Sequence, residues 1–316
     1  MSEPTNRRSF YPTPAWLIYG LLVVEGLLWL SERYGWFWFN EKKGWTVLIG
    51  VAVVGGVMLV MLGWFIASLI FRWRFQFSLR SLLIMVVAVA VPCSWLTTEI
   101  RAARRQTVAV AAIEMAGGTV EYDWQQDANG KRVRHALPQG PTWLRTLLGI
   151  NIFEQVKSVE VERSLIEYDH TLGPTHFTDI GLENVKDMPQ LEVLSIGVSD
   201  VTDAGMGHLE GLGHLRRLEL FGTKVTDTGL GHLAKLSQLQ ELNLWETQVT
   251  DAGLPHLAGL SQLRSLNLSE TQVTNAGVGY LAGLRQLRHL NLFGTKVTDQ
   301  GVKKLQQALP DCKIFR

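Results

Sequence analysis

The side chains of this chain that could bind a ligand or react recur at a fixed spacing of 24 residues. One column contains His208, His232 and His256, followed at the same spacing by Tyr280 and Lys304. Stacked imidazoles could hold a metal ion, but zinc needs three or four ligands that converge in a tetrahedral array, and a straight column does not converge. We therefore predict no metal site and interpret this column as rings that cover a helix surface.

A second column carries aromatic side chains at Phe221, Trp245 and Phe293, with Ser269 between the last two, and we place Phe315 at its end. Exposed rings on a rigid sheet are typical of partner anchors, because aromatic residues dominate the energetics of interfaces. In the alternative interpretation, the rings pack on one another and on adjacent loops without a ligand. We favour partner binding and predict that Trp245 is the principal anchor.

Polar residues beside the rings could orient such a partner through hydrogen bonds. They are Glu219, Glu241, Asn243, Asn267 and Asn291. The predicted partner is a protein or a peptide, and the predicted binding surface is the concave face of the sheet.

A catalytic site would need a nucleophile with its base, a pair of carboxylates or a phosphate-binding loop. The sequence contains no G-x-S-x-G, H-E-x-x-H, P-loop or G-x-G-x-x-G motif. The recurring Asp203, Asp227, Asp251 and Asp299 are better explained as helix caps. We predict that the protein is not an enzyme and binds no cofactor.

The elements that position these columns follow from six blocks that begin at residues 177, 201, 225, 249, 273 and 297. In each block, a short strand such as "LRRLEL" directs Leu218 and Leu220 inward, and a segment such as "TDAGMGHLEGL" returns the chain as a helix. One block cannot bury its own apolar face, so we expect the blocks to stack into a curved α/β solenoid with a continuous core. The recurring glycine at Gly205 and its equivalents is expected where a side chain would crowd the neighbouring coil.

The last block departs from this pattern. The spacing of Leu309, Cys312 and Ile314 reproduces L-x-x-L-x-L after a loop that is two residues shorter. We therefore expect Cys312 to take the place of a core leucine as a buried, unreactive side chain. Lys313 and Arg316 would then protect the exposed edge of the sheet from pairing.

Residues 1–100 have the composition of a membrane region, with apolar runs at 15–31, 44–71 and 79–97. A bilayer requires about 20 predominantly apolar residues of helix, so we expect about three transmembrane helices and a multi-pass protein of the cell membrane. The small residues Ala52, Gly56, Gly63 and Ala67 share one face of the second run and would allow close helix contact or homo-oligomerisation. The basic residues on the two sides number five and six, so orientation stays open.

Residues 101–176 are expected to form a linker helix and a small α/β module that caps the repeats. The segment 98–118 has helix-forming composition and ends in two glycines, while "TVEYDW" and "VKSVEVE" have the alternation of strands. Residues 177–316 carry thirteen basic and fifteen acidic side chains, so nothing in their charge favours a nucleic-acid partner.

The tail L-x-x-L-x-L-x-x-T-x-V of each block is close to the leucine-rich-repeat signature, with Thr223, Thr247, Thr271 and Thr295 where Asn or Cys usually stands. The blocks resemble the bacterial V-T-D-A-G-L class of leucine-rich-repeat proteins, and "FQFSLRSLLIMVVAVAVPCSW" resembles the F-S-L-R membrane anchor that often precedes such repeats. The resemblance implies a membrane-tethered interaction domain outside the cytoplasm. Two additional apolar runs depart from the usual single anchor.

The leading hypothesis is therefore a membrane-anchored leucine-rich-repeat protein that binds a protein or peptide on its concave sheet face. The alternative is a structural envelope protein that self-associates through its membrane helices and uses the solenoid as a spacer.

Overall fold

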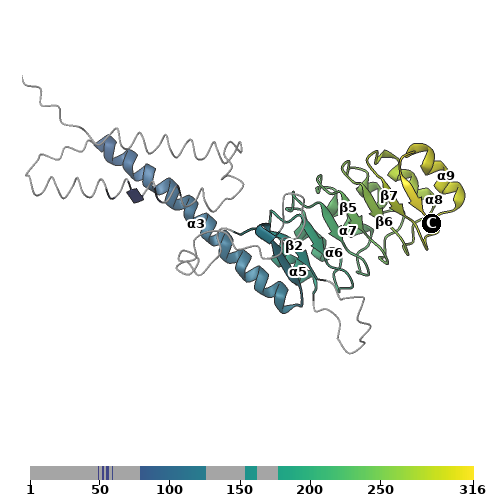
Figure 1. The fold of residues 1–316 in the computed structure, drawn as a ribbon, viewed down its shortest axis with the longest axis horizontal. Helices are drawn as coiled ribbons and strands as arrows, with labels where there is room; N and C mark the ends of the chain where they lie inside the picture. Colours follow the sequence, from purple (N-terminus) through teal and green to yellow (C-terminus); the bar gives the residue numbers. More distant parts are fainter. Residues whose placement is uncertain are drawn as a thin grey trace, which may run out of the picture. The chain divides into compact units, whose positions relative to one another are not determined.

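The computed structural model describes residues 79–125, 154–161 and 177–316, together with five isolated residues between 49 and 59 (Figure 1). The predicted membrane spans 15–31 and 44–71 lie almost wholly outside these residues, and so do Gly63 and Ala67 of the small-residue face. The third predicted span lies within a helix of the described part. Within the described ranges, no helix is both long enough and apolar enough to cross a bilayer. The described part therefore does not support the transmembrane prediction.

The first described element is helix α3, Leu79–Met115, which continues without a break past residue 97, as the linker-helix prediction required. Gly117 ends it with φ +84, a left-handed conformation that glycine adopts without steric cost. The amides of Gly118 and Gly117 donate to the carbonyls of Ile113 and Glu114, which satisfies the last turn of the helix.

The described residues contain one sheet of eight strands, arranged in sequence order. The strands are β1 Thr119–Tyr122, β2 Val156–Glu160, β3 Val193–Ser195, β4 Arg217–Glu219, β5 Glu241–Asn243, β6 Ser265–Asn267, β7 His289–Asn291 and β8 Lys313–Phe315. The pair β1–β2 is antiparallel, and every later pair is parallel with a register of 24 residues from β3 onward. Figure 1 shows β5, β6 and β7 side by side in successive repeats.

The returning segments are shorter and less regular than the sequence predicted. They are α5 Asp179–Val185, α6 Asp203–Met206 with η3 Gly207–Leu209, α7 Asp227–Leu233, η4 Leu254–Leu257, α8 Asn275–Val278 with η5 Gly279–Gly283, and α9 Asp299–Ala308. Several are partly or wholly 3-10 helix. A 24-residue repeat leaves only about one to two turns after its strand and loops, and 3-10 geometry covers the same distance with fewer residues.

A hydrogen-bonded ladder joins each repeat to the next. The Oδ1 atom of Asp203 accepts from the amide of Thr226, and its Oδ2 atom accepts from the Thr226 hydroxyl. The pattern recurs at Asp179, Asp227 and Asp251, at 2.7–2.8 Å for the amide and 2.5–2.7 Å for the hydroxyl. Thr202, Thr226 and Thr274 in turn cap their own helices; Thr226, for example, accepts from the amide of Thr228. Threonine is thus the cap of its own repeat, and aspartate holds the following one.

The recurring glycine makes room for this aspartate, as the sequence predicted. A Cβ atom at Gly229 would lie 2.5 Å from Oδ1 of Asp203, and the four equivalent positions leave 2.1–2.5 Å to the corresponding oxygen. Any side chain there would push the ladder apart. The spacing between repeats therefore depends on glycine and aspartate together.

The core is a continuous stack of leucines. Leu218 and Leu220 are fully buried, as are their equivalents in the following repeats up to Leu290 and Leu292, which lie at 0% exposure. The core extends to the other end of the sheet, where Ile113 of α3 and Val159 of β2 join it. Residues before the repeats thus join the core of the repeats, and the capping module over 101–176 stays a prediction.

The last repeat is aligned differently from the expectation. Strand β8 pairs Lys313 with His289 and Ile314 with Leu290, so Ile314 takes the place of the first inward leucine of the strand. Helix α9 has ten residues and is α-helical throughout, and the strand that follows it keeps the 24-residue register. Cys312 is buried at 3% exposure, as predicted, but it lies before the strand and not within it.

The ladder predicts a graded response to substitution at Asp227. In Asp227→Ala, both hydrogen bonds to Thr250 are lost and the amide keeps no acceptor, so the free energy of unfolding should fall by about 1–3 kcal/mol. Asp227→Asn should cost much less, because Asn275 already occupies the equivalent place and bonds both the amide and the hydroxyl of Thr298. Thermal unfolding of the full chain, followed by circular dichroism, measures both changes, and equal losses in the two variants would contradict this account.

Cys312 should be unreactive in the folded protein. Burial raises the pKa of its thiol, so little of the nucleophilic thiolate forms near neutral pH. Iodoacetamide at about pH 8 should leave Cys312 unmodified in the folded chain and modify it in denaturant. Modification of Cys312 in the folded chain at the rate seen in denaturant would contradict this account.

Candidate partner-binding site

The face of the sheet opposite the buried leucines carries the predicted binding residues. In β4 to β7 the middle residue of each strand is buried and the two flanking residues are not. The flanking residues and the ring positions 221, 245, 269 and 293, two residues after each strand, form columns across neighbouring repeats. We call the surface made by these columns the open sheet face. The strands stand about 4.8 Å apart, so a column is a nearly continuous row of side chains.

Glu219 and Glu241 belong to an ion-pair network on this face. Arg217 bonds the carboxylate of Glu241 in the next repeat and lies 3.6 Å from Glu219 in its own strand. The guanidinium and the Glu241 carboxylate are about half exposed, so the network adds little to stability. The two glutamates predicted to orient a partner are thus already engaged by a neighbour.

The asparagines Asn243, Asn267 and Asn291 form a column whose first role is local. Their Oδ1 atoms accept from the amides of Trp245, Ser269 and Phe293, two residues further along, at 3.0–3.1 Å. Each asparagine therefore fixes the backbone that carries the ring position. Their Nδ2 groups make no hydrogen bond within the described part of the chain and remain available as donors.

The aromatic column divides into a packed part and an exposed part. Phe221 is buried at 5% exposure and lies over Gly197 of the preceding repeat, where a Cβ atom would come within 2.0–2.4 Å of its ring. Trp245 stacks on Phe221 with ring centroids 5.8 Å apart and an interplanar angle of 24°. For Phe221 the packing interpretation is therefore correct, and the expectation of an exposed anchor is wrong.

Phe293 is the exposed ring of this column, at 62% exposure, while Trp245 is half-buried. Phe315 is also exposed, at 57%, but it pairs with Asn291 and so lies in the asparagine column. The predicted place of Phe315 after Phe293 was wrong because the register of β8 follows helix α9 and not the spacing of the apolar residues. Trp245 and Phe293 are the two predicted anchors that share a column and remain accessible.

A feature that the sequence analysis missed follows the ring position. Five residues at the same place in successive repeats have positive φ, namely Val198, Gly222, Glu246, Glu270 and Gly294, at 52–68°. Side chains rarely adopt this conformation, because Cβ crowds the following carbonyl. The recurrence of glycine at 222 and 294, a multiple of the repeat length apart, was the available indication.

The helical side carries the predicted histidine column. The rings of His232 and His256 lie against Gly207 and Gly231 of the preceding repeats, so they cover the helix surface as predicted. His232 Nδ1 also lies 2.8 Å from Glu210, and Lys235 pairs with the same carboxylate. These bonds, first from His232 and then from Lys235, lower the pKa of Glu210. Among the described residues, no three His, Cys, Asp or Glu side chains are grouped to hold a metal ion.

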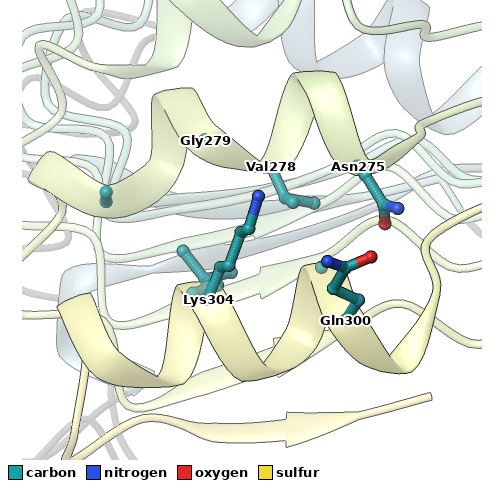
Figure 2. A pocket seen from close by; sticks show the side chains of 8 residues that line it. Asn275, Val278, Gly279, Gln300 and Lys304 are labelled. Atoms are coloured by element: carbon teal, nitrogen blue, oxygen red, sulfur yellow. The ribbon is translucent and has the colours of Figure 1, made fainter.

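A small cleft lies at the end of the histidine column, where Lys304 follows Tyr280. Figure 2 shows Lys304 of α9 extending toward α8, with Asn275 and Gln300 at the same opening. The cleft has a volume of about 140 Å³ and arises because a slender lysine stands where earlier repeats place a ring. Ligand pockets typically measure about 300–1,000 Å³, so this space is too small to suggest a ligand site.

Family models place leucine-rich repeats in this region. Residues 237–297 match a family described as "Leucine rich repeat", and residues 214–234 match a second family with the same description. The repeat domain is therefore a leucine-rich-repeat solenoid. No curated protein matches the sequence.

Solved structures that are similar to part of this chain include bacterial leucine-rich-repeat proteins. An internalin (inlF) from Listeria monocytogenes is 29% identical over 44% of this chain and 38% of its own, with a TM-score of 0.39. Internalin C2 from the same organism is 25% identical over 42% of this chain and 55% of its own, with a TM-score of 0.32. An LRR protein from Leptospira interrogans is 16% identical over 42% and 45%, with a TM-score of 0.30. The chain thus spans roughly two fifths to a little over half of the length of these proteins.

The positive-φ column predicts opposite effects at two equivalent positions. Gly222→Ala should lower the free energy of unfolding by about 1 kcal/mol through backbone strain alone, because the nearest atom to the added Cβ lies 3.5 Å away. Glu246→Gly should raise it by up to about 1 kcal/mol, because it removes the same strain. Urea unfolding of the two variants tests this, and a destabilised Glu246→Gly would show that its side chain holds the fold.

Proposed function

We propose that this leucine-rich-repeat protein binds a protein or peptide partner on its open sheet face, around Trp245 and Phe293. Leucine-rich-repeat proteins generally mediate protein–protein interaction, and stacked repeats provide an extended, rigid surface for it. The observation that carries the proposal is the exposure of Phe293 beside a half-buried Trp245 in one column. Burying a phenylalanine fully contributes about 1.5–3 kcal/mol, which a partner would recover.

The polar surroundings of the rings support the same proposal. The asparagine column offers Nδ2 donors next to the rings, and its oxygens hold the ring-bearing backbone in place. A partner would therefore meet a preorganised surface, and little conformational entropy would be lost on binding. Proteins of this class are typically interaction modules without enzymatic activity, consistent with the interpretation of the recurring aspartates as ladder residues.

The location of the repeats is a separate part of the proposal. We infer from the apolar runs at 15–31, 44–71 and 79–97 that the N-terminal region tethers the chain to the cell membrane. From the resemblance to the bacterial V-T-D-A-G-L class with its F-S-L-R anchor, we further infer that the repeats lie outside the cytoplasm. This part is supported by the sequence alone. Extraction of native membranes with alkaline carbonate should leave the full chain in the pellet, and protease added to intact cells should remove the repeats. Release of the chain by carbonate would contradict the tether.

Partner capture tests the binding face directly. Cross-linked pull-downs from native membranes should recover a partner with the intact chain and lose most of it with Phe293→Ala and with Trp245→Ala plus Phe293→Ala. Tyr280→Ala is the matched control, because Tyr280 is an exposed ring, at 52%, on the helical side. Phe293→Ala removes little packing, so its loss of binding would not reflect unfolding.

Two results would redirect the interpretation. A partner that all variants retain would place binding elsewhere on the chain. Capture of nothing but further copies of this chain would favour the structural alternative, in which the N-terminal region self-associates and the solenoid is a spacer.

A further inference from the structure

One ring is missing from the aromatic column of the open sheet face. From Gly197 onward the column continues through Phe221, Trp245 and Ser269 to Phe293. Phe221 fills the space over Gly197, and Trp245 stacks on Phe221. At the next place Ser269 has no ring to continue the stack. We call this place, between Trp245 and Phe293, the missing ring position.

The geometry of the column sets the size of the missing ring position. Trp245 and Phe293 belong to strands two apart, so their backbones stand about 10 Å from each other. The stacked pair Phe221 and Trp245, in adjacent repeats, has a centroid distance of 5.8 Å. One planar group placed between Trp245 and Phe293 would therefore stand at about stacking distance from both rings.

Ser269 places no ring at this position. The Ser269 hydroxyl donates to Asn267 Oδ1 at 2.6 Å, and the Ser269 amide donates to the same atom at 3.0 Å. Ser269 is buried at 5% exposure, below the level of the rings. Both hydrogen bonds that Ser269 donates are thus made within its own turn.

Two glutamates lie next to the missing ring position, each directly after a residue of the column. Glu246 comes after Trp245, and Glu270 comes after Ser269, with its carboxylate against Gly294 beside Phe293. Both are exposed, and neither side chain takes part in an ion pair or hydrogen bond in the described ranges. Both also have positive φ, where the equivalent residues at 222 and 294 are glycines. The glutamates of the neighbouring columns, by contrast, are neutralised by Arg217.

We propose that the missing ring position takes the guanidinium of an arginine from the partner. This inference rests on the proposed function and names the chemistry that the face recognises. A guanidinium is planar, stacks on aromatic faces and pairs with carboxylates in a bidentate arrangement. It therefore satisfies both the rings and the two glutamates. An aromatic ring would match the rings but leave the carboxylates unpaired, and a lysine ammonium lacks the plane.

The decisive variant fills the position from within the chain. Ser269→Phe places at this site the residue that equivalent positions 221 and 293 already carry, so the backbone accepts it and the ring can stack on Trp245. It should unfold at the same or a higher temperature, yet lose binding. Ser269→Ala is the matched control, because it changes the same residue and leaves the position open.

The probe is a library of random dodecapeptides on phage, selected on the immobilised full chain. Selected peptides should be enriched in arginine, and a synthetic copy should lose about tenfold or more in affinity when that arginine is replaced by citrulline, which is planar but neutral. Ser269→Phe and Glu246→Gln plus Glu270→Gln should show similar losses, and Ser269→Ala a much smaller one. Glu246→Gly plus Glu270→Gly should gain stability and still lose affinity, which separates recognition from structure.

The outcomes distinguish this inference from the proposed function. Selected peptides that lack arginine but fail on Ser269→Phe would overturn the choice of a cation. Peptides that bind Ser269→Phe unchanged but fail on Trp245→Ala plus Phe293→Ala would overturn the missing ring position and leave the binding face intact. Peptides that bind all variants equally, or no selection above background, would overturn both.

Discussion

The repeats depend on one interaction between neighbouring coils: an aspartate of one repeat accepts both the amide and the hydroxyl of a threonine in the next. The bond satisfies a helix N-terminus that would otherwise present unpaired donors, and it forms only because glycine leaves space for the aspartate oxygen. Its recurrence fixes the translation from coil to coil on the helical side. The strands on the other side then pair at the same interval, and leucines fill the space between the two rows.

This arrangement separates stability from recognition. The ladder and the leucines lie on the helical side and in the interior, whereas the open sheet face contributes few buried contacts after Phe221 and Trp245. Residue types on that face can therefore differ from repeat to repeat without loss of the fold, since each coil contacts only its neighbours. Ser269 shows this freedom, because the same place accepts glycine, phenylalanine, tryptophan and serine in successive repeats. The two glutamates with positive φ show its limit, because they remain where glycine would be less strained.

The electrostatic pattern of the face follows the same logic. Arg217 pairs with Glu219 in its own strand and with Glu241 in the next repeat, and so offsets the charge of these two carboxylates. Glu246, in the same repeat as Glu241, and Glu270, in the next repeat, form no ion pair in the part of the chain that the structure describes. A patch of unpaired carboxylates beside accessible rings attracts a cation more strongly than either feature would alone, because the rings displace water from the charged groups.

The sequence by itself determined the repeat length, the inward leucines, the glycine spacing and the burial of Cys312, because each is a local demand that recurs at 24 residues. It also placed Trp245 and Phe293 on one face, since side chains alternate along a strand. Only the tertiary structure decided which side chains meet across repeats. Phe221 is buried because Gly197 of the preceding coil accepts its ring, Asp203 holds Thr226 instead of its own helix, and Phe315 moves to the asparagine column because β8 keeps the 24-residue register. These contacts join residues more than twenty positions apart. The periodic pattern predicts whether a side chain points inward or outward, but it does not predict which side chain of the next repeat it contacts.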